Sequence, residues 1–246
     1  MTFQKHSDFF DPIGRPYELV TEELDSYLEF DSIEGALSAI ANGEMVIVVD
    51  DEGRENEGDL IMAADAVTPA AINFMATLGR GLICVAMTTN RLEDLALPQM
   101  VPENTEYLST GFAISCDLKE GTTTGISATD RAKTIRALAD ARRVAADFNR
   151  PGHVFPLRAH PRGVLGRQGH TEAAVDLARF AGRYPAGVLF EIAQPDGEMA
   201  RLPELWRFAR QHRLTLVSIA DLIVWREARY GLTDQPFGPS AQARQY

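Results

Sequence analysis

The sequence predicts an α/β (α+β) protein, built as a single layered domain in which helices pack on a mixed sheet. Helix-like and strand-like patterns alternate along the chain without an internal repeat, as in layered folds that combine helices with a sheet. The 246 residues are enough for one large core, and we find no linker that divides them. A hydrophobic content of 45% and a charged content of 24% are those of an ordinary globular protein.

The elements follow from local patterns. In DSIEGALSAIANG, residues 31–43, apolar residues recur at helical spacing, Asp31 and Glu34 are spaced as a capping box, and Gly43 is a typical stop. The apolar run at 44–50 then predicts a buried strand. There follow a helix at 68–79 that opens with Thr-Pro, apolar strands at 80–87 and 110–117, and helices at 130–141 and 171–182. A strand at 186–193, a helix at 202–212, a strand at 214–219 and a helix at 220–230 complete the series.

The two ends of the chain differ from the middle. We expect the domain to span 32–230, preceded by an amino-terminal extension at 1–31 and followed at 231–246 by a polar, flexible tail rich in turn formers. The amino terminus has no apolar stretch of signal-peptide length, and no run elsewhere is long enough to span a bilayer. The expected location is therefore the cytoplasm.

The formal net charge is −11. Such a chain repels nucleic acids and anionic membranes at long range, so neither is an expected partner. An anionic substrate must instead be met by local cations, which are Arg, His or a bound metal.

Cys84 and Cys116 are the only cysteines, and both lie in apolar, strand-like runs. Small core residues are a better interpretation of such thiols than a disulfide or a zinc site. A reactive role for Cys84 stays open.

An acidic segment, VVDDEGRENEGDL at 48–60, crowds six carboxylates around the single Arg54. Neighbouring carboxylates repel, so a folded chain keeps them in water or around something positive. A solvated loop is the simpler interpretation. However, Gly53 and Gly58 allow close approach of the backbone to a ligand, and Arg54 beside Glu55 pairs an anion-binding fork with an oxygen ligand for a hard cation.

A second informative segment holds His153, His160 and His170. His160, between Ala and Pro, is best read as a satisfied polar group. His170 precedes a predicted helix start, where Arg167 and the free backbone N–H groups near Thr171 offer an anion site and the imidazole can bind a metal. His153 follows Pro-Gly, which places it on a tight turn before the strand-like run VFPL at 154–157. General acid or base work is feasible there, as is a structural hydrogen bond.

Two further features carry weaker signals. The hydroxyls and amides of Thr122, Thr123 and Thr124, ahead of Gly125, could cradle a phosphate or sugar, although such residues also form ordinary turns. Glu191 lies in a run that predicts a buried strand. A carboxylate there must be paired or take part in proton transfer.

Taken in order, DDEGRENEGDL, TTTGISATDR, NRPGHVFPLRA, GRQGHTEAAVDL and GVLFEIAQPDGEMAR resemble the 3,4-dihydroxy-2-butanone 4-phosphate synthase family of riboflavin biosynthesis. The resemblance runs from about Ser32 to about Tyr230. It implies conversion of D-ribulose 5-phosphate to a four-carbon dihydroxybutanone phosphate and formate, with two Mg²⁺ or Mn²⁺ ions per site. It also implies a three-layer fold and a homodimer whose sites are completed across the interface. Some relatives continue into a GTP cyclohydrolase II domain, so we expect the single-function form.

The family's residue roles carry over by position. Its metal ligands match Glu55 and His170, and its two residues essential for chemistry match His153 and Glu191. Its substrate contacts fall on Arg54, Glu55, Asp59, Arg167, Gln168, Gly169, His170, Thr171 and Glu191. Gly53 and Gln168 are small departures that remove no side chain with a role. Under this resemblance, metals offset the repulsion within the acidic segment and stabilise an enediolate, and Arg167 anchors the phosphate.

Two alternatives remain open. A generic metal-dependent sugar-phosphate isomerase or aldolase would use the same carboxylate, His and Arg set, but would release no formate. A degenerate copy, kept as a binding or regulatory module, would have lost motif residues, and none of those mapped above is missing.

Overall fold

The computed structural model describes residues 28–231. Most of the predicted extension (1–27) and nearly all of the tail (232–246) therefore lie outside the described residues, and the proposed domain limits remain predictions.

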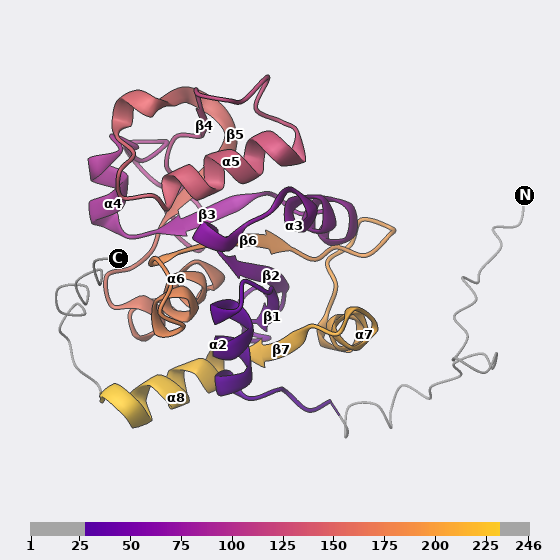
Figure 1. Ribbon diagram of the computed structural model, residues 1–246. Coiled ribbons are helices and arrows are strands. Elements are labelled where there is room, and N and C mark those ends of the chain that lie inside the picture. Colours follow the sequence, from indigo (N-terminus) through magenta and orange to yellow (C-terminus); the bar gives the residue numbers. More distant parts are fainter. Residues whose placement is uncertain (1–27, 232–246) are drawn as a thin grey trace, which may run out of the picture.

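A seven-stranded mixed sheet forms the middle layer, as the alternating pattern predicts (Figure 1). The strands are β1 (Val46–Val49), β2 (Gly58–Ala63), β3 (Cys84–Met87), β4 (Cys116–Leu118), β5 (Phe148–Arg158), β6 (Ala186–Glu191) and β7 (Thr215–Ser218). Their order is β4-β5-β3-β6-β2-β1-β7. The pairs β1–β7 and β3–β5 are parallel, and the other neighbours are antiparallel.

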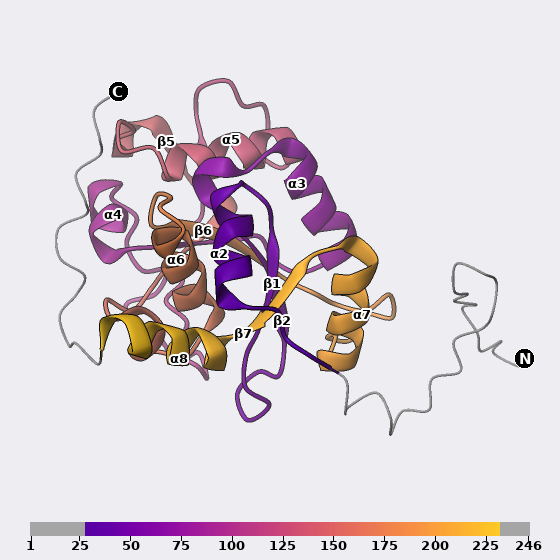
Figure 2. The same ribbon diagram turned by 60° about the horizontal axis from the view of Figure 1, so that its bottom comes forward.

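Helices cover both faces of this sheet and complete the three layers (Figures 1 and 2). One face carries α2 (Ile33–Ala41), α6 (His170–Phe180) and α8 (Ile219–Tyr230). The other carries α3 (Pro69–Phe74), which a π-turn at Met75–Gly79 extends, together with α4 (Thr89–Asp94), α5 (Ala128–Leu138) and α7 (Leu202–His212). Short 3₁₀ turns lie at Ala64–Ala66, Ala145–Asp147 and Gly163–Leu165.

Two hydrophobic cores result, one on each face. Ile47 and Leu60 point into the core under α3, α5 and α7, whereas Val48 and Ile61 point into the core under α2, α6 and α8. Successive side chains of a strand alternate between faces, so a strand buried on both faces must be apolar throughout. This requirement explains the uninterrupted run VIVV in β1, which is buried along its whole length.

Because of the strand directions, several chain segments meet at one end of the inner strands β1, β2 and β6. β1 ends there at Val49, whose register partner Gly58 begins β2. The next residue of β2, Asp59, lies opposite Glu191, the last residue of β6. The acidic segment connects β1 to β2, so it lies at this end of the strands, beside the last residue of β6.

Two elements escape the sequence prediction. β2 follows the acidic segment directly, and its buried Asp59 interrupts the apolar pattern by which a strand is recognised. α4 is only six residues long, and its sequence TNRLED has too few apolar residues to show helical spacing.

The predicted capping box of the first helix is wrong. Ser32 is the N-cap, and its Oγ accepts a hydrogen bond of 3.1 Å from the backbone N–H of Gly35. Asp31 instead accepts a 2.8 Å hydrogen bond from the backbone N–H of Leu216 on β7, and Glu34 accepts one from the indole of Trp225. Both carboxylates thus serve tertiary contacts that sequence spacing cannot show.

Candidate active site

The acidic segment is a closed loop organised by Asp50. One carboxylate oxygen, Oδ2, accepts hydrogen bonds from Arg54 Nη1 at 2.9 Å and from the backbone N–H of Glu55 at 3.0 Å. The other, Oδ1, accepts one from the backbone N–H of Glu57 at 2.9 Å. Because the Asp50 side chain is fully buried, its charge is compensated within the loop. Part of the like charge predicted for this segment is therefore neutralised by the protein itself.

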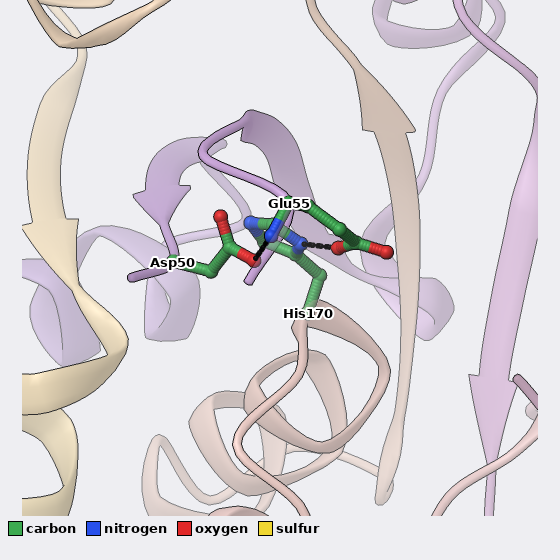
Figure 3. Close-up of side chains that lie close together, drawn as sticks. All are labelled: Asp50, Glu55 and His170. Atoms are coloured by element: carbon green, nitrogen blue, oxygen red, sulfur yellow. Dashed lines mark hydrogen bonds and ion pairs between the residues drawn. The ribbon is translucent and has the colours of Figure 1, made fainter. Parts of the chain in front are cut away.

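Glu55 and His170 meet at the centre of the site (Figure 3). His170 is the first residue of α6, and its Nδ1 lies 3.2 Å from Glu55 Oε2 and 4.0 Å from Asp59 Oδ1. Ligand atoms of Asp50, Glu55 and His170 all lie within 4.8 Å of one another. The sequence prediction named Glu55 and His170 as metal ligands and did not include Asp50, because spacing alone does not show which carboxylates of an acidic loop turn inward.

Charge interactions within this cluster are strong. Burial raises the pKa of Asp59 to about 8, against the opposing effect of His170 and with support from the charges of Glu191 and Glu55. Burial opposes the charged form of His170, but the carboxylates of Asp59, Glu55 and Asp50 outweigh it and raise the pKa of His170 to about 9. Burial likewise opposes the charge on Glu55, yet hydrogen bonding from His170 and the charge of Arg54 lower the pKa of Glu55 to about 2.

Two buried atoms in the cluster lack hydrogen-bond partners among residues 28–231, namely Asp59 Oδ1 and His170 Nε2. Unsatisfied buried polar atoms are rare and call for an explanation. A divalent cation would supply a partner to them. Carboxylate oxygens with a single imidazole suit Mg²⁺ or Mn²⁺ better than a softer ion, so the residues present fit the predicted metal.

Gly169, the residue before α6, separates two arginines. A Cβ atom at this position would lie 2.5 Å from Arg167 Nη1 and 2.9 Å from Arg54 Nη2, so the absence of a side chain lets both guanidinium groups approach the helix start. Arg167 is more constrained than the sequence suggests. Its Nη1 donates to Glu172 at 2.8 Å and its Nη2 to Thr110 Oγ1 at 3.0 Å.

The neighbours of Gly169 have different surroundings. Thr171 is buried in the first turn of α6, 4% exposed. Gln168 is exposed and lines a cavity of about 320 Å³ together with Asp51 and Glu57 of the acidic loop and Leu202 at the start of α7.

Glu191 is the last residue of β6 and half-buried, rather than enclosed within a strand as predicted. Its carboxylate accepts a 2.7 Å hydrogen bond from the backbone N–H of Leu82. A Cβ atom at Gly81 would lie 2.3 Å from its Oε2, so Gly81 leaves room for the carboxylate. Glu191 therefore lies beside its register partner Asp59, which borders the candidate metal site.

His153 lies apart from this cluster. It belongs to β5 and not to a turn, which corrects the prediction from its Pro-Gly context. In the sheet order, β3 and β6 stand between β5 and β2. With about 4.8 Å between neighbouring strands, the backbones of His153 and Asp59 are roughly 14 Å apart. Within residues 28–231 of one chain, the structure thus gathers the other predicted site residues around α6 and leaves His153 to one side.

The contacts of His153 are instead with Asp117 on β4, which sequence reasoning did not identify. Its Nδ1 lies 2.7 Å from Asp117 Oδ2. The threonine-rich segment packs on this pair, since a Cβ atom at Gly125 would lie 2.1 Å from Asp117 Oδ2. Thr123 is held by Asp130 through its backbone N–H and its hydroxyl. A single Asp at the end of an apolar run gives no signal in the sequence that could have identified this contact.

The two cysteines are free and buried, as expected of core residues. Burial raises the pKa of Cys116 to about 12 and that of Cys84 well above its ordinary value, and the charges of Glu191 and Asp59 add to the effect on Cys84. A protonated, enclosed thiol is a poor nucleophile, which argues against a reactive role for Cys84. His160 also has the structural role expected of it, because its Nδ1 accepts a 3.1 Å hydrogen bond from the backbone N–H of Arg162.

Comparison with known proteins gives a consistent result. The family model for 3,4-dihydroxy-2-butanone 4-phosphate synthase matches residues 34–225. A relative of that name from Agrobacterium fabrum is 60% identical over 191 residues, which cover 78% of this chain and 90% of the relative. A riboflavin biosynthesis protein RibBA from Aquifex aeolicus is 56% identical, and the match covers 84% of this chain but 52% of that longer protein.

Solved structures agree with the fold. A crystal structure of 3,4-dihydroxy-2-butanone 4-phosphate synthase in complex with two magnesium ions superposes with a TM-score of 0.79 at 44% identity, covering 83% of this chain and all of the other. A two-domain enzyme of the same kind, RibBX from A. baumannii, gives a TM-score of 0.78 at 48% identity and is covered over 59% of its length.

The mixed sheet, the acidic cluster at its edge and these relatives define an enzyme of riboflavin biosynthesis. The chain belongs to the 3,4-dihydroxy-2-butanone 4-phosphate synthase family. Within residues 28–231, no helix combines the length and the apolar character needed to cross a membrane.

Proposed function

We propose that the enzyme converts D-ribulose 5-phosphate to 3,4-dihydroxy-2-butanone 4-phosphate and formate, with Mg²⁺ or Mn²⁺ at two positions per site. The observation that carries this proposal is the position of the Glu55–His170 pair at the start of α6, directly beside the arginines that flank Gly169. A sugar phosphate needs both features, namely a hard cation for its oxygens and an anion seat for its phosphate.

The phosphate seat is the amino terminus of α6. A helix of eleven residues presents unpaired backbone N–H groups and a partial positive charge at this end. Arg54 Nη2 and Arg167 Nη1 point to the same place. Arg167 Nη1 is paired there with Glu172, so Arg54 Nη2 and the backbone N–H groups supply the rest of the local attraction that an anionic substrate needs against a net charge of −11.

Glu55 and His170 would hold the metal, and the related structure with two magnesium ions supports two positions. When bound, the ions supply positive charge that stabilises an enediolate. Asp50 keeps Glu55 in position through its bonds to the loop backbone, and Asp59 borders the same space.

Proton transfers fall to Glu191 and His153. The reaction begins with removal of a proton beside the substrate ketone, and formate loss requires further transfers, so more than one acid or base must surround the sugar. Glu191 stands next to Asp59 and is fixed by the N–H of Leu82. His153 presents a half-exposed imidazole.

The separation of His153 from the metal cluster supports a homodimer whose sites are completed across the interface. At roughly 14 Å from Asp59, the His153 of one chain is poorly placed to act on a substrate held by that chain's own α6. Leu82, beside Glu191, is 41% exposed, and Ile126, beside the loop over His153, is 54% exposed. Exposed apolar side chains near Glu191 and near His153 are suited to a contact between subunits.

Formate release from ribulose 5-phosphate tests the reaction. We expect formate and dihydroxybutanone phosphate in equal amounts, dependent on added Mg²⁺ or Mn²⁺. Conversion to an isomeric pentulose phosphate, or cleavage to two smaller sugars without formate, would instead identify a sugar-phosphate isomerase or an aldolase.

A further inference from the structure

Among residues 28–231, both carboxylate oxygens of Asp117 contact a single residue, His153. Oδ1 accepts a 2.9 Å hydrogen bond from the backbone N–H of His153, and Oδ2 lies 2.7 Å from the Nδ1 of its ring. The Asp117 residue is buried, at 7% exposure, whereas 43% of the His153 side chain is exposed. The carboxylate is therefore enclosed in the protein while the ring it holds reaches the surface.

The backbone around the pair is shaped to allow this contact. On β5, the register with β4 jumps from Val154 opposite Cys116 to Asn149 opposite Asp117, so the intervening residues bulge out of the ladder. A Cβ atom at Gly152 would lie 2.1 Å from the carbonyl carbon of Cys116, so only glycine fits there. The N–H of Gly152, which has no ladder partner, donates to Ser115 Oγ at 3.1 Å.

The threonine-rich loop shields the contact. Gly125 has a φ of +94° and passes so close that a Cβ atom would lie 2.1 Å from Asp117 Oδ2 and 2.7 Å from His153 Nδ1. Asp130 fixes this loop by accepting from the N–H groups of Thr123 and Gly125. A second, independent set of hydrogen bonds therefore holds the cover over the pair.

The arrangement fixes which ring nitrogen carries the proton. A carboxylate only accepts hydrogen bonds, so the proton between Oδ2 and Nδ1 belongs to His153. In the neutral ring, the lone pair then resides on Nε2. We propose that Asp117 is a positioning residue for the reaction, which orients the imidazole and holds its basic nitrogen, Nε2, toward the substrate space. This inference rests on the proposed role of His153 in proton transfer.

The first test needs no variant. Nitrogen-15 NMR of the histidine-labelled parent protein reports the tautomer of each ring, and His153 is assigned as the signal lost in His153→Asn. The expected result is a neutral ring protonated at Nδ1. Protonation at Nε2 in the neutral ring would overturn the proposal.

The second test is Asp117→Asn. The Asn carbonyl can still accept from the backbone N–H of His153, but its amide must then donate to Nδ1, which moves the ring proton to Nε2 and removes the outward lone pair. We expect kcat for formate release to fall by about 10²–10⁴. KM for ribulose 5-phosphate and the melting temperature should change little, and the nitrogen-15 spectrum should show the tautomer reversed.

Ser115→Ala is the matched control, because it loosens the backbone of the same bulge and leaves the ring contact intact. Its kcat should stay within a few-fold of the parent. The double variant Asp117→Asn/His153→Asn should be no slower than His153→Asn alone, since Asp117 acts through the ring. Near-parental kcat of Asp117→Asn, equal losses in Ser115→Ala, or additive losses in the double variant would each refute a positioning role. Near-parental kcat of His153→Asn would refute the underlying role of His153 instead.

Discussion

Asp59 and Glu191 lie directly opposite each other on the antiparallel strands β2 and β6. Asp59 is 2% exposed and has an oxygen without a partner among the described residues, while Glu191 is half-buried and hydrogen-bonded. Burial raises the pKa of Asp59 to about 8, and the nearby charge of Glu191 adds to this rise, so Asp59 retains its proton to high pH. The stability of the metal-free protein should therefore depend on pH through Asp59.

Without metal, stability should fall as pH rises from about 5 to 9. The pKa of Asp59 is raised to about 8 and that of His170 to about 9, so between these values and their ordinary ones the folded chain binds more protons than the unfolded chain. Stability from these two groups is then present at low pH and lost as pH rises through the folded-state values. Melting temperatures measured in EDTA at a series of pH values give the dependence of stability on pH. Asp59→Asn should make that dependence weaker. A melting temperature that rises steadily over this range would contradict the assignment.

Metal binding should release protons. Because the pKa of His170 is raised to about 9 and that of Asp59 to about 8, both groups carry a proton at pH 7. An ion bound at His170 should displace about one proton, and an ion that also contacts Asp59 should displace about two. Affinity should therefore increase with pH up to about 9. Titration calorimetry in two buffers of different ionisation enthalpy counts the protons. EDTA should abolish turnover, Mg²⁺ or Mn²⁺ should restore it, and His170→Ala should stay folded without activity. Full turnover in excess EDTA would sink the metal proposal.

Phosphate recognition should depend on the space at Gly169. Gly169→Ala pushes Arg167 and Arg54 away from the helix start, so KM for ribulose 5-phosphate should rise at least tenfold, which corresponds to about 1.4 kcal/mol of binding. Arg167→Ala should do the same, and ribulose without phosphate should be a poor substrate of the parent. Arg142→Ala, at a side chain 90% exposed, is the control and should behave as the parent. Equal turnover of ribulose and ribulose 5-phosphate would show that Arg167 and the start of α6 do not bind the phosphate.

Glu191→Gln and His153→Asn should separate catalysis from folding. Each replaces a proton-transfer group with a neutral one of similar size, and such losses slow a reaction by about 10²–10⁴. Both variants should dimerise and bind substrate and metal, while formate release slows by that amount. Activity lost only in proportion to unfolding would return the residue concerned to a structural role.

Mixing these two variants should restore activity if sites are shared between subunits. In a mixed dimer, one site receives both substitutions and the other receives neither. Random exchange makes half of the dimers mixed, so about a quarter of parental activity should return. Subunit exchange, followed by the formate assay, measures it. No recovery under conditions where mass spectrometry shows mixed dimers would place both residues in the site of one chain.

The fold class could be predicted from the sequence because its signals are local, and so could the position of Arg167 and His170 at a helix start, whereas their roles in the site stay predictions. A continuous apolar run such as VIVV identifies a strand buried on both faces, and Gly before His170 marks a helix start. The contacts of Asp31, Asp50 and Asp117 could not be predicted, since each carboxylate finds its partners through loop closure or across the sheet. β2 was missed for a related reason, because its buried, polar Asp59 breaks the apolar pattern of a strand.

The sheet order has a final consequence for how the site withstands local opening. β2 and β6 are inner strands with neighbours on both sides. We therefore expect the backbone that carries Asp59 and Glu191 to unfold only when the whole domain unfolds. β4, which carries Asp117, is a three-residue strand at the margin of the sheet. The half of the site proposed to hold metal and phosphate is thus built on the inner strands of the sheet. His153 lies on β5, beside the marginal strand β4. A second subunit that packs there would stabilise these strands, so dimer formation would determine how firmly the imidazole is held.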